Sequence, residues 1–238
     1  MNTNGRGTMK VKETNGVVDL IEDEVVEAPA DIRTIELPVI DERSATVTVK
    51  GMTPLIVHRF DEKARQMMED KTTGAATDKK PLREPEELWR DAAYVVPGCD
   101  DMDDWTPGKY CFPATAFKHA FLYGVALLSD MKKMPKTKAT GYMFVGEDPV
   151  LQFESVSLRK DTVRVGGGTA MVAYRPQFNE WSCDLEIAYD GNAITLEQVV
   201  ALLDRGGFAG GIGEWRPSSP KNKSGSYGRF RVESVRSA

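Results

Sequence analysis

Residues 108–130 read GKYCFPATAFKHAFLYGVALLSD, and this stretch decides the fold. A short segment up to Phe112 predicts a strand, Pro113 predicts a break, and Thr115 is the expected N-cap of a helix. The helix is predicted because apolar residues recur three and four positions apart, which places them on one face. These residues are Phe117, Ala120, Phe121, Gly124, Val125 and Leu128. We expect that face to lie in the core.

More strands and one further helix are predicted on either side of this segment. Alternating apolar residues and local composition predict strands over residues 45–57, 150–158, 181–189 and 229–235. Thr195 and Gln198 have the spacing of a capping box, and they open a second core helix that is predicted to end at Gly206. The resulting βαββαβ order predicts an α+β protein with a ferredoxin-like (RRM-like) core that carries insertions.

The composition is ordinary for a globular protein and bounds its class. The 238 residues are 41% hydrophobic and 28% charged, which suffices for a full core. No apolar run approaches the roughly 20 residues that cross a bilayer, and the N-terminus lacks the apolar core of a signal peptide, so we expect a cytoplasmic protein with no membrane contact. The 3 cysteines form no CxxC pair and are odd in number, which indicates neither a disulfide framework nor a zinc knuckle and predicts structural thiols. We expect no cofactor and no bound metal.

Charge is divided unevenly along the chain. Residues 1–104 carry 14 Lys and Arg against 23 Asp and Glu, whereas residues 105–238 carry 17 against 13. The acidic residues gather in the leader and around 99–105, either as a solvated tail or as a mask over a basic groove. We expect residues 1–35 to be a flexible acidic leader. Residues 36–238 are expected to form one domain with a mobile polar insertion around 71–85.

Residues 206–230, here called the glycine-rich loop, read GGFAGGIGEWRPSSPKNKSGSYGRF. Glycine permits unusual turns and close approach to the main chain. A solvated linker is a poor explanation, because Phe208, Ile212, Trp215 and Tyr227 are too apolar for one. Since the loop joins a predicted core helix to a predicted core strand, it is expected to be part of the fold.

Three segments, in order, resemble the RAMP superfamily, which contains the repeated backbone subunit of CRISPR effector complexes. VTVKGMTPLIVHRF (47–60) resembles its opening strand, YCFPATAFKHAFLYGVA (110–126) its "iPgsSlKGalR" strand-to-helix junction, and GGFAGGIGEWRPSSPKNKSGSYGRFRV (206–232) its C-terminal glycine-rich loop. The resemblance spans about Ala45 to Val235. Ala114 and Thr115 stand where the family has Gly-Ser, His119 replaces a glycine, and the loop is longer.

The acidic leader and the compact size look most like phage-encoded relatives of that subunit, which bind single-stranded DNA and accompany recombination enzymes. The resemblance therefore implies a non-catalytic protein that coats single-stranded nucleic acid, most of all DNA, in phage recombination or replication within the host-cell cytoplasm. It also implies side-by-side subunits or a helical filament, and a recombinase among the partners. A CRISPR-type RNA-binding backbone subunit and a RAMP-like endoribonuclease are the alternatives.

Binding a single strand without sequence choice needs cations for phosphates and flat side chains for bases. The candidates are Arg59; Lys118, Lys132, Lys133 and Lys136; Arg159, Lys160, Arg164 and Arg175; and Trp215, Arg216, Lys221, Lys223 and Arg229. Tyr174 is a second aromatic candidate. The glycines at 166–168 predict a β-hairpin that could project between adjacent bases.

Catalysis and protein interaction are the competing function classes. His58 next to Arg59 is placed to act as a general base, and His119 is the only other histidine. Metal-assisted cleavage could use acidic residues, namely Asp61, Asp100, Asp101, Asp103 and Asp104, although the last four are typical of a solvated loop. No phosphate-binding, dinucleotide, zinc or serine-hydrolase motif is present. A phage structural or protein-interaction subunit is the third reading.

Overall fold

The computed structural model describes residues 10–14, 17–21, 39–60, 69–70, 72–73, 84–99, 104–129, 136–165, 169–220 and 225–237. The chain divides into two units, Met1–Val39 and Ile40–Ala238. In the first unit, β1 (Lys10–Thr14) pairs antiparallel with β2 (Val17–Ile21), a hairpin that the sequence pattern does not indicate. The rest of the expected flexible leader, and all of the insertion around 71–85 except residues 72–73 and 84–85, lie outside the described residues.

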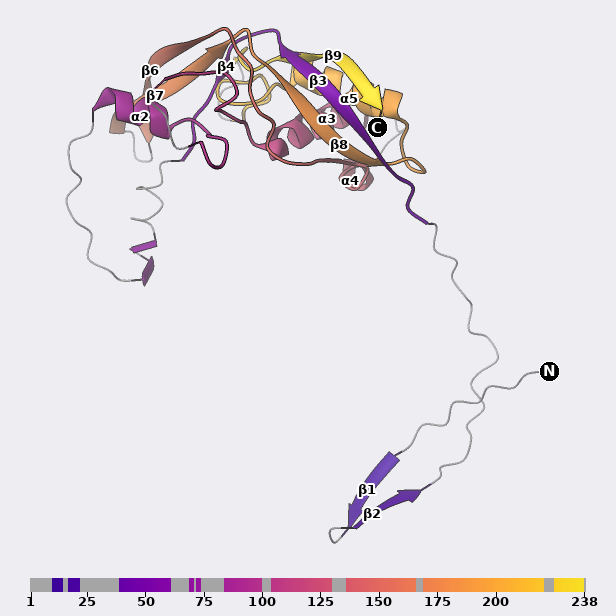
Figure 1. The fold of residues 1–238 in the computed structure, drawn as a ribbon. Helices are drawn as coiled ribbons and strands as arrows, with labels where there is room; N and C mark the ends of the chain where they lie inside the picture. The colour runs from indigo at the N-terminus through magenta and orange to yellow at the C-terminus, as the bar shows by residue number, and fades with distance from the viewer. Residues whose placement is uncertain are drawn as a thin grey trace. The chain divides into compact units, whose positions relative to one another are not determined.

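The second unit is built on a four-stranded antiparallel sheet (Figure 1). Its strands are β3 (Glu42–Gly51), β5 (Met143–Val145), β8 (Ser182–Asp190) and β9 (Phe230–Ser237). Helix α3 (Ala114–Ser129) follows β3, and α5 (Leu196–Ala209) follows β8. The chain order is therefore βαββαβ, and the strands lie in the order β5-β8-β3-β9. This arrangement confirms the α+β class and the ferredoxin-like core.

The prediction of the second core strand over 150–158 is wrong. The second strand of the βαββαβ core is instead β5, which pairs with β8 and has only three residues, too few to show a periodicity. Val150 and Gln152 make isolated bridges to Cys111 and Ser182. The chain then enters β6 (Ser155–Val165), which pairs along its whole length with β7 (Thr169–Asn179). This pairing confirms the predicted hairpin. Together with β4 (Leu55–Ile56), the two strands form a separate three-stranded sheet.

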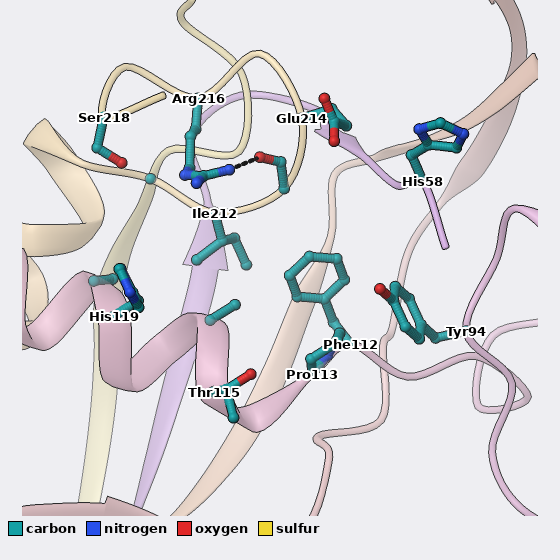
Figure 2. Close-up of a pocket in the computed structure, with 14 residues that line it drawn as sticks. His58, Tyr94, Phe112, Pro113, Thr115, His119, Ile212, Glu214, Arg216 and Ser218 are labelled. Carbon is teal, nitrogen blue, oxygen red and sulfur yellow. Dashed lines mark hydrogen bonds between the residues drawn. The ribbon is translucent and has the colours of Figure 1, made fainter. Parts of the chain in front are cut away.

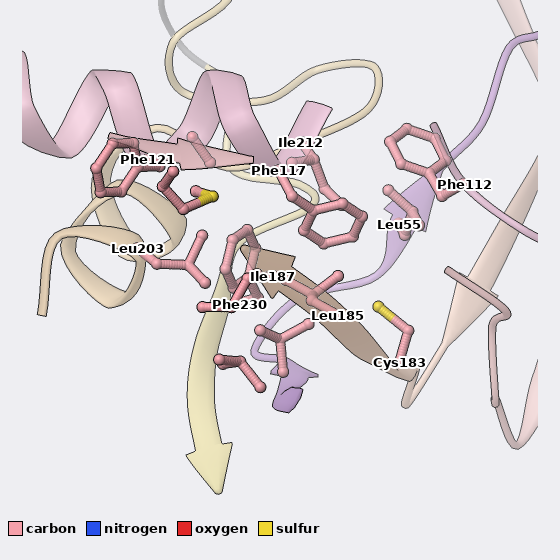
Figure 3. Close-up of a cluster of buried hydrophobic side chains, with 14 of the residues drawn as sticks. Leu55, Phe112, Phe117, Phe121, Cys183, Leu185, Ile187, Leu203, Ile212 and Phe230 are labelled. Carbon is pink, nitrogen blue, oxygen red and sulfur yellow. The ribbon is translucent and has the colours of Figure 1, made fainter. Parts of the chain in front are cut away.

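The core lies between the four-stranded sheet and the helices α3 and α5. Figure 3 shows aromatic and aliphatic side chains from both layers meeting there. Phe117, Ala120, Phe121 and Val125 are buried, which confirms the predicted apolar face. The helix begins at Ala114, so Thr115 is not its cap. Instead the Asp148 carboxylate accepts the Ala114 N–H at 2.7 Å, a cap from a distant loop that the local sequence does not encode.

Two glycines let α3 and α5 cross in close contact. A Cβ at Gly206 would lie 1.8 Å from the Ala120 carbonyl oxygen, and one at Gly124 would lie 2.1 Å from that of Leu202. The prediction that α5 ends at Gly206 is therefore wrong: the helix runs on to Ala209, and the glycine serves helix packing. The predicted capping box of Thr195 and Gln198 is present.

Two smaller helices and the sheet edge complete the unit. Helix α2 (Pro85–Asp91) begins at Pro85, and α4 (Lys136–Ala139) precedes β5. On the edge strand β9, the Val232 N–H donates to the Asp204 carboxylate at 2.9 Å, and that carboxylate also accepts from Arg231 Nε at 2.7 Å. Among the described helices, none is both long and apolar enough to span a membrane.

Candidate nucleic-acid interface

The described part of the glycine-rich loop is anchored by backbone hydrogen bonds. Gly228 N–H donates to the Pro54 carbonyl at 2.8 Å, and Glu214 N–H to that of Ile56 at 2.9 Å, so both sides of the loop are fixed to the β4 segment. Gly213 and Gly228 adopt φ of 74° and 63°, in the left-handed region that favours glycine. A Cβ at Gly228 would lie 1.8 Å from the Ile212 carbonyl oxygen. The glycines therefore make a compact turn rather than a tether.

One face of the β6–β7 hairpin carries a continuous hydrogen-bonded row of polar side chains, here called the polar ladder. Its members are Ser155, Ser157, Asn179, Gln177, Arg159, Asp161 and Arg175. Asn179 donates to both serines and accepts from Gln177, whose oxygen in turn accepts from Arg159 at 3.2 Å. The Asp161 carboxylate accepts from Arg159 at 2.9 Å and from Arg175 at 3.1 Å.

Arg175 connects the polar ladder to the glycine-rich loop. Its side chain is only 7% exposed, and Nη2 lies 3.5 Å from His58 Nδ1 and 4.0 Å from a Glu214 carboxylate oxygen. Burial first, and the Arg175 charge second, lower the pKa of His58, although Glu214 opposes the shift. The buried Nε of Arg175 has no hydrogen-bond partner among the described residues.

The loop and the hairpin also meet at the surface. The guanidinium carbon of Arg159 lies 5.0 Å from the centre of the Tyr227 ring, within the range of a cation–π contact. On the opposite face of the hairpin, Lys160 Nζ lies 5.5 Å from the Trp89 ring and 5.7 Å from the Tyr174 ring. Both faces of the hairpin thus combine a cation with an aromatic ring.

A pocket of about 320 Å³ lies between the glycine-rich loop and the first turns of α3 (Figure 2). Its apolar lining includes Phe112, Pro113 and Ile212. Its polar lining comprises His58, His119, Tyr94, Thr115, Glu214, Arg216 and Ser218. In Figure 2 the two histidines lie towards opposite ends, and Arg216 Nη1 donates to the Gly213 carbonyl at 2.7 Å.

Only some of the predicted site residues come together. His58, Arg159, Arg175 and Arg216 surround the junction of loop and hairpin, and half-buried Trp215 lies within the loop. Lys118 lies elsewhere, 3.8 Å from the Phe144 ring on β5, and Arg229 stacks on Phe208 at the end of α5. Arg59 is half-buried, and its backbone N–H donates to the Ala92 carbonyl.

Other candidates cannot be placed or have simple local partners. Lys132, Lys133, Lys221 and Lys223, with Asp61, Asp100, Asp101 and Asp103, lie outside the described residues. For Lys136 and Arg164 the structure describes only the backbone. Asp104 is exposed and pairs with Lys109 at 3.0 Å. Cys111 and Cys183 are buried free thiols, and burial raises the pKa of Cys111 to about 11.

Sequence reasoning missed the residues that hold the site together. Asp161 and Glu214 face the buried cation Arg175, and Tyr94, Phe112 and Tyr227 supply the rings of the site. Strand alternation offered one signal, because Arg159 and Asp161 stand two positions apart and so share a face of β6. No local signal marks Glu214, whose role depends on the fold bringing the loop to β7.

Comparison with known proteins yields distant likenesses of fold. No protein-family model and no curated protein sequence matches the chain. Among solved structures, the crystal structure of Cmr6 from Pyrococcus furiosus has a TM-score of 0.39 and 12% identity, covering 82% of this chain and 100% of that one. The cryo-EM structure of the Type III-B Cmr-beta bound to cognate target RNA gives 0.42 and 10%, covering 82% and 60%. The ferredoxin-like assignment rests on the strand order described above.

Proposed function

We propose that this chain binds single-stranded nucleic acid where the glycine-rich loop meets the β6–β7 hairpin. The observation that carries the proposal is the convergence of cations and rings at that junction, with Arg159 against Tyr227 at its centre and Arg216 nearby in the loop. Cations attract phosphates, and rings stack on bases whatever their sequence. A surface that offers both, on elements fixed to the core, suits a strand bound without strong sequence choice.

The open face of the four-stranded sheet is a weaker candidate for the same task. Its central strands present Asp184 and Glu186, whose carboxylates accept hydrogen bonds from Thr48 and Thr46 at 2.7 Å and 2.9 Å. Arg236 on β9 is paired with Asp184 at 3.0 Å. Carboxylates repel phosphates. The threonine hydroxyls and the Arg236 guanidinium on this face are already engaged by those carboxylates. The strand is therefore assigned to the hairpin side.

The sequence resemblance leaves two readings of the bound strand, DNA and RNA. Coating of DNA in phage recombination, with a recombinase partner, rests on the resemblance alone. An RNA-binding backbone subunit is the alternative, and RNA is the first probe because one solved structure of similar fold was determined with target RNA. Side-by-side assembly belongs to both readings. Electron microscopy of the chain on long strands tests it, and isolated subunits at saturation would exclude a filament.

Binding is proposed to proceed without cleavage. His58 is the candidate general base, but its Nδ1 faces the Arg175 guanidinium rather than a carboxylate that would make it more basic. The His58→Ala variant should still bind the strand, and neither it nor the parent chain should yield cleavage products. Products that disappear in the variant would place the protein among the nucleases.

The deciding experiment is fluorescence anisotropy of labelled RNA and DNA oligonucleotides over a salt series. The triple variant Arg216→Ala, Lys221→Ala, Lys223→Ala should bind more weakly, and its salt dependence should flatten by up to about 0.7 of a slope unit per lost phosphate contact. The matched control is Arg43→Ala, Lys50→Ala, Arg236→Ala, which removes three exposed cations from the four-stranded sheet.

The two triple variants separate local binding from overall charge. Weakened binding in the loop variant alone supports the assigned surface. Equal losses in both would mean that net charge, and not the loop, governs affinity. Absence of binding at low salt, for both RNA and DNA, would refute the function itself.

A further inference from the structure

The pocket between the glycine-rich loop and α3 offers chemistry that differs from the surrounding interface. Phosphate is the first ligand to consider, since a helix N-terminus lies beside the pocket. However, the Asp148 carboxylate already accepts the first N–H of α3 at 2.7 Å. Within the lining itself, Glu214 supplies a carboxylate. These two negative charges oppose an anion at this place.

The described cations at the pocket already have partners. Among the described lining residues Arg216 is the one permanent cation, and its Nη1 is engaged by the Gly213 carbonyl. Arg175, which faces His58 from β7, is already paired with Asp161 at 3.1 Å. Burial and Arg175 lower the pKa of His58, against the opposing charge of Glu214, and the lowered pKa favours the neutral imidazole. A neutral imidazole both donates and accepts hydrogen bonds. The pocket therefore suits a neutral polar ligand better than a phosphate.

The lining has two parts that together suit a flat heterocycle. Phe112, Pro113 and Ile212 supply apolar surface, and the hydroxyls of Thr115 and Ser218 can donate and accept. Glu214 can only accept, and Arg216 can only donate. A nucleobase has apolar faces and an edge that carries both donors and acceptors. Proteins that hold an unstacked base use this combination of apolar contacts and edge hydrogen bonds.

We propose that this pocket takes one unstacked nucleobase of the bound strand. The inference rests on the proposed strand-binding function and adds a contact to base edges where the rest of the interface contacts phosphates and base faces. One base per subunit would leave the stack and enter between the loop and α3. The pocket thereby gives an otherwise sequence-tolerant surface one position at which base identity matters.

The histidines provide a direct test on the intact chain. The protein has 2 histidines and both line the pocket, so the imidazole proton signals in NMR report on it without background. Adenosine, guanosine, cytidine and uridine are titrated separately, with inorganic phosphate as the second probe. A base in the pocket should shift both signals saturably through its ring current. Phosphate would instead raise the imidazole pKa values, because a nearby anion favours the charged form.

A variant that fills the pocket links it to strand binding. Thr115→Trp places a bulky side chain at an exposed lining position, and Ser234→Trp places the same bulk on exposed β9 as the control. The Thr115 variant should bind an ordinary strand roughly 5- to 100-fold more weakly, the factor expected for one lost base contact. It should bind a fully abasic strand as the parent chain does.

Each outcome decides one of the two proposals. Saturable nucleoside shifts with unchanged imidazole pKa values in phosphate support the base pocket. Nucleosides that leave both signals in place, phosphate-raised pKa values, or equal losses in the two tryptophan variants overturn it. Failure of the strand-binding function is read separately, as absence of any anisotropy change with intact oligonucleotides.

Discussion

The helical layer, formed by α3, α5 and the buried face of the four-stranded sheet, is held by apolar packing. The hairpin–loop region, formed by β6, β7 and the described glycine-rich loop, adds charges and amides to the apolar packing of Phe178 and Ile212. In the helical layer, Phe117, Phe121 and Leu203 are fully buried among apolar neighbours. In the hairpin–loop region, Asp161 and Arg175 are buried and paired. Apolar contacts weaken by degrees, whereas a broken buried ion pair leaves a whole charge without a partner.

The difference predicts that the largest single loss of stability comes from the polar ladder. Asp161→Ala removes the carboxylate shared by Arg159 and Arg175 and leaves Arg175 charged and buried. We expect the free energy of unfolding to fall by about 3–5 kcal/mol, measured by urea denaturation. A loss of only about 0.5 kcal/mol, as for a surface site, would contradict the contrast between the regions.

A double variant serves as the control for this prediction. Asp161→Ala combined with Arg175→Met replaces the pair by apolar side chains and should recover much of the lost stability, because no buried charge remains. Strand binding should still be measured in both variants. Equal stability of the single and double variants would mean that Glu214, 4.0 Å from Arg175, is a sufficient partner for the remaining charge.

The second prediction concerns the helix crossing and is smaller. Gly206→Ala introduces a Cβ 1.8 Å from the Ala120 carbonyl oxygen, so α3 and α5 must separate. We expect a loss of about 1–3 kcal/mol in thermal or urea unfolding. Gly141→Ala is the matched control, since its Cβ would meet nothing closer than 3.8 Å. If Gly206→Ala lowers the free energy of unfolding no more than Gly141→Ala does, the packing of α3 against α5 can adjust to an added methyl group.

The same contrast explains how far the sequence could predict the structure. Apolar periodicity revealed α3, α5, β3 and β8, because their buried faces repeat within each element. It assigned the second core strand to 150–158 in place of β5, whose three residues are too few to show a period. It also misread Gly206, since a glycine that serves a helix contact resembles one that ends a helix. The sequence allowed Arg and Lys residues to be proposed for the interface, because these side chains carry the positive charge that phosphates attract. Their partners, Asp161 and Glu214, depend on hairpin register and on loop placement.

A third prediction tests the long-range cap of α3. Asp148→Ala removes the acceptor of the Ala114 N–H, and we expect unfolding to become easier by about 1 kcal/mol. Asp148→Asn keeps an acceptor oxygen and should retain most of the stability. If alanine and asparagine behave alike, a group other than the side chain at position 148 satisfies the helix end.

The smallest predicted effect is a pH dependence in the hairpin–loop region. Burial and Arg175 of β7 lower the pKa of His58 in the folded chain, against the opposing charge of Glu214 in the loop. Unfolding then favours proton uptake, so stability is full above the ordinary pKa of 6.5 and declines as pH falls below it. His58→Gln should flatten this decline in urea denaturation at stepped pH. If stability declined more steeply with falling pH in the variant than in the parent chain, the pKa of His58 would not be lowered by folding, and the prediction would be wrong.

Asp204 has a consequence for how copies of this chain could assemble. An edge strand offers unpaired N–H groups to which another chain can add by continuing the sheet. On β9 the Val232 N–H is already taken by the Asp204 carboxylate, which Arg231 holds in place. Sheet extension is therefore blocked at this point of the edge. Neighbouring copies along a strand would have to meet there through side chains, and a contact of that kind can form and release without remaking a β-sheet.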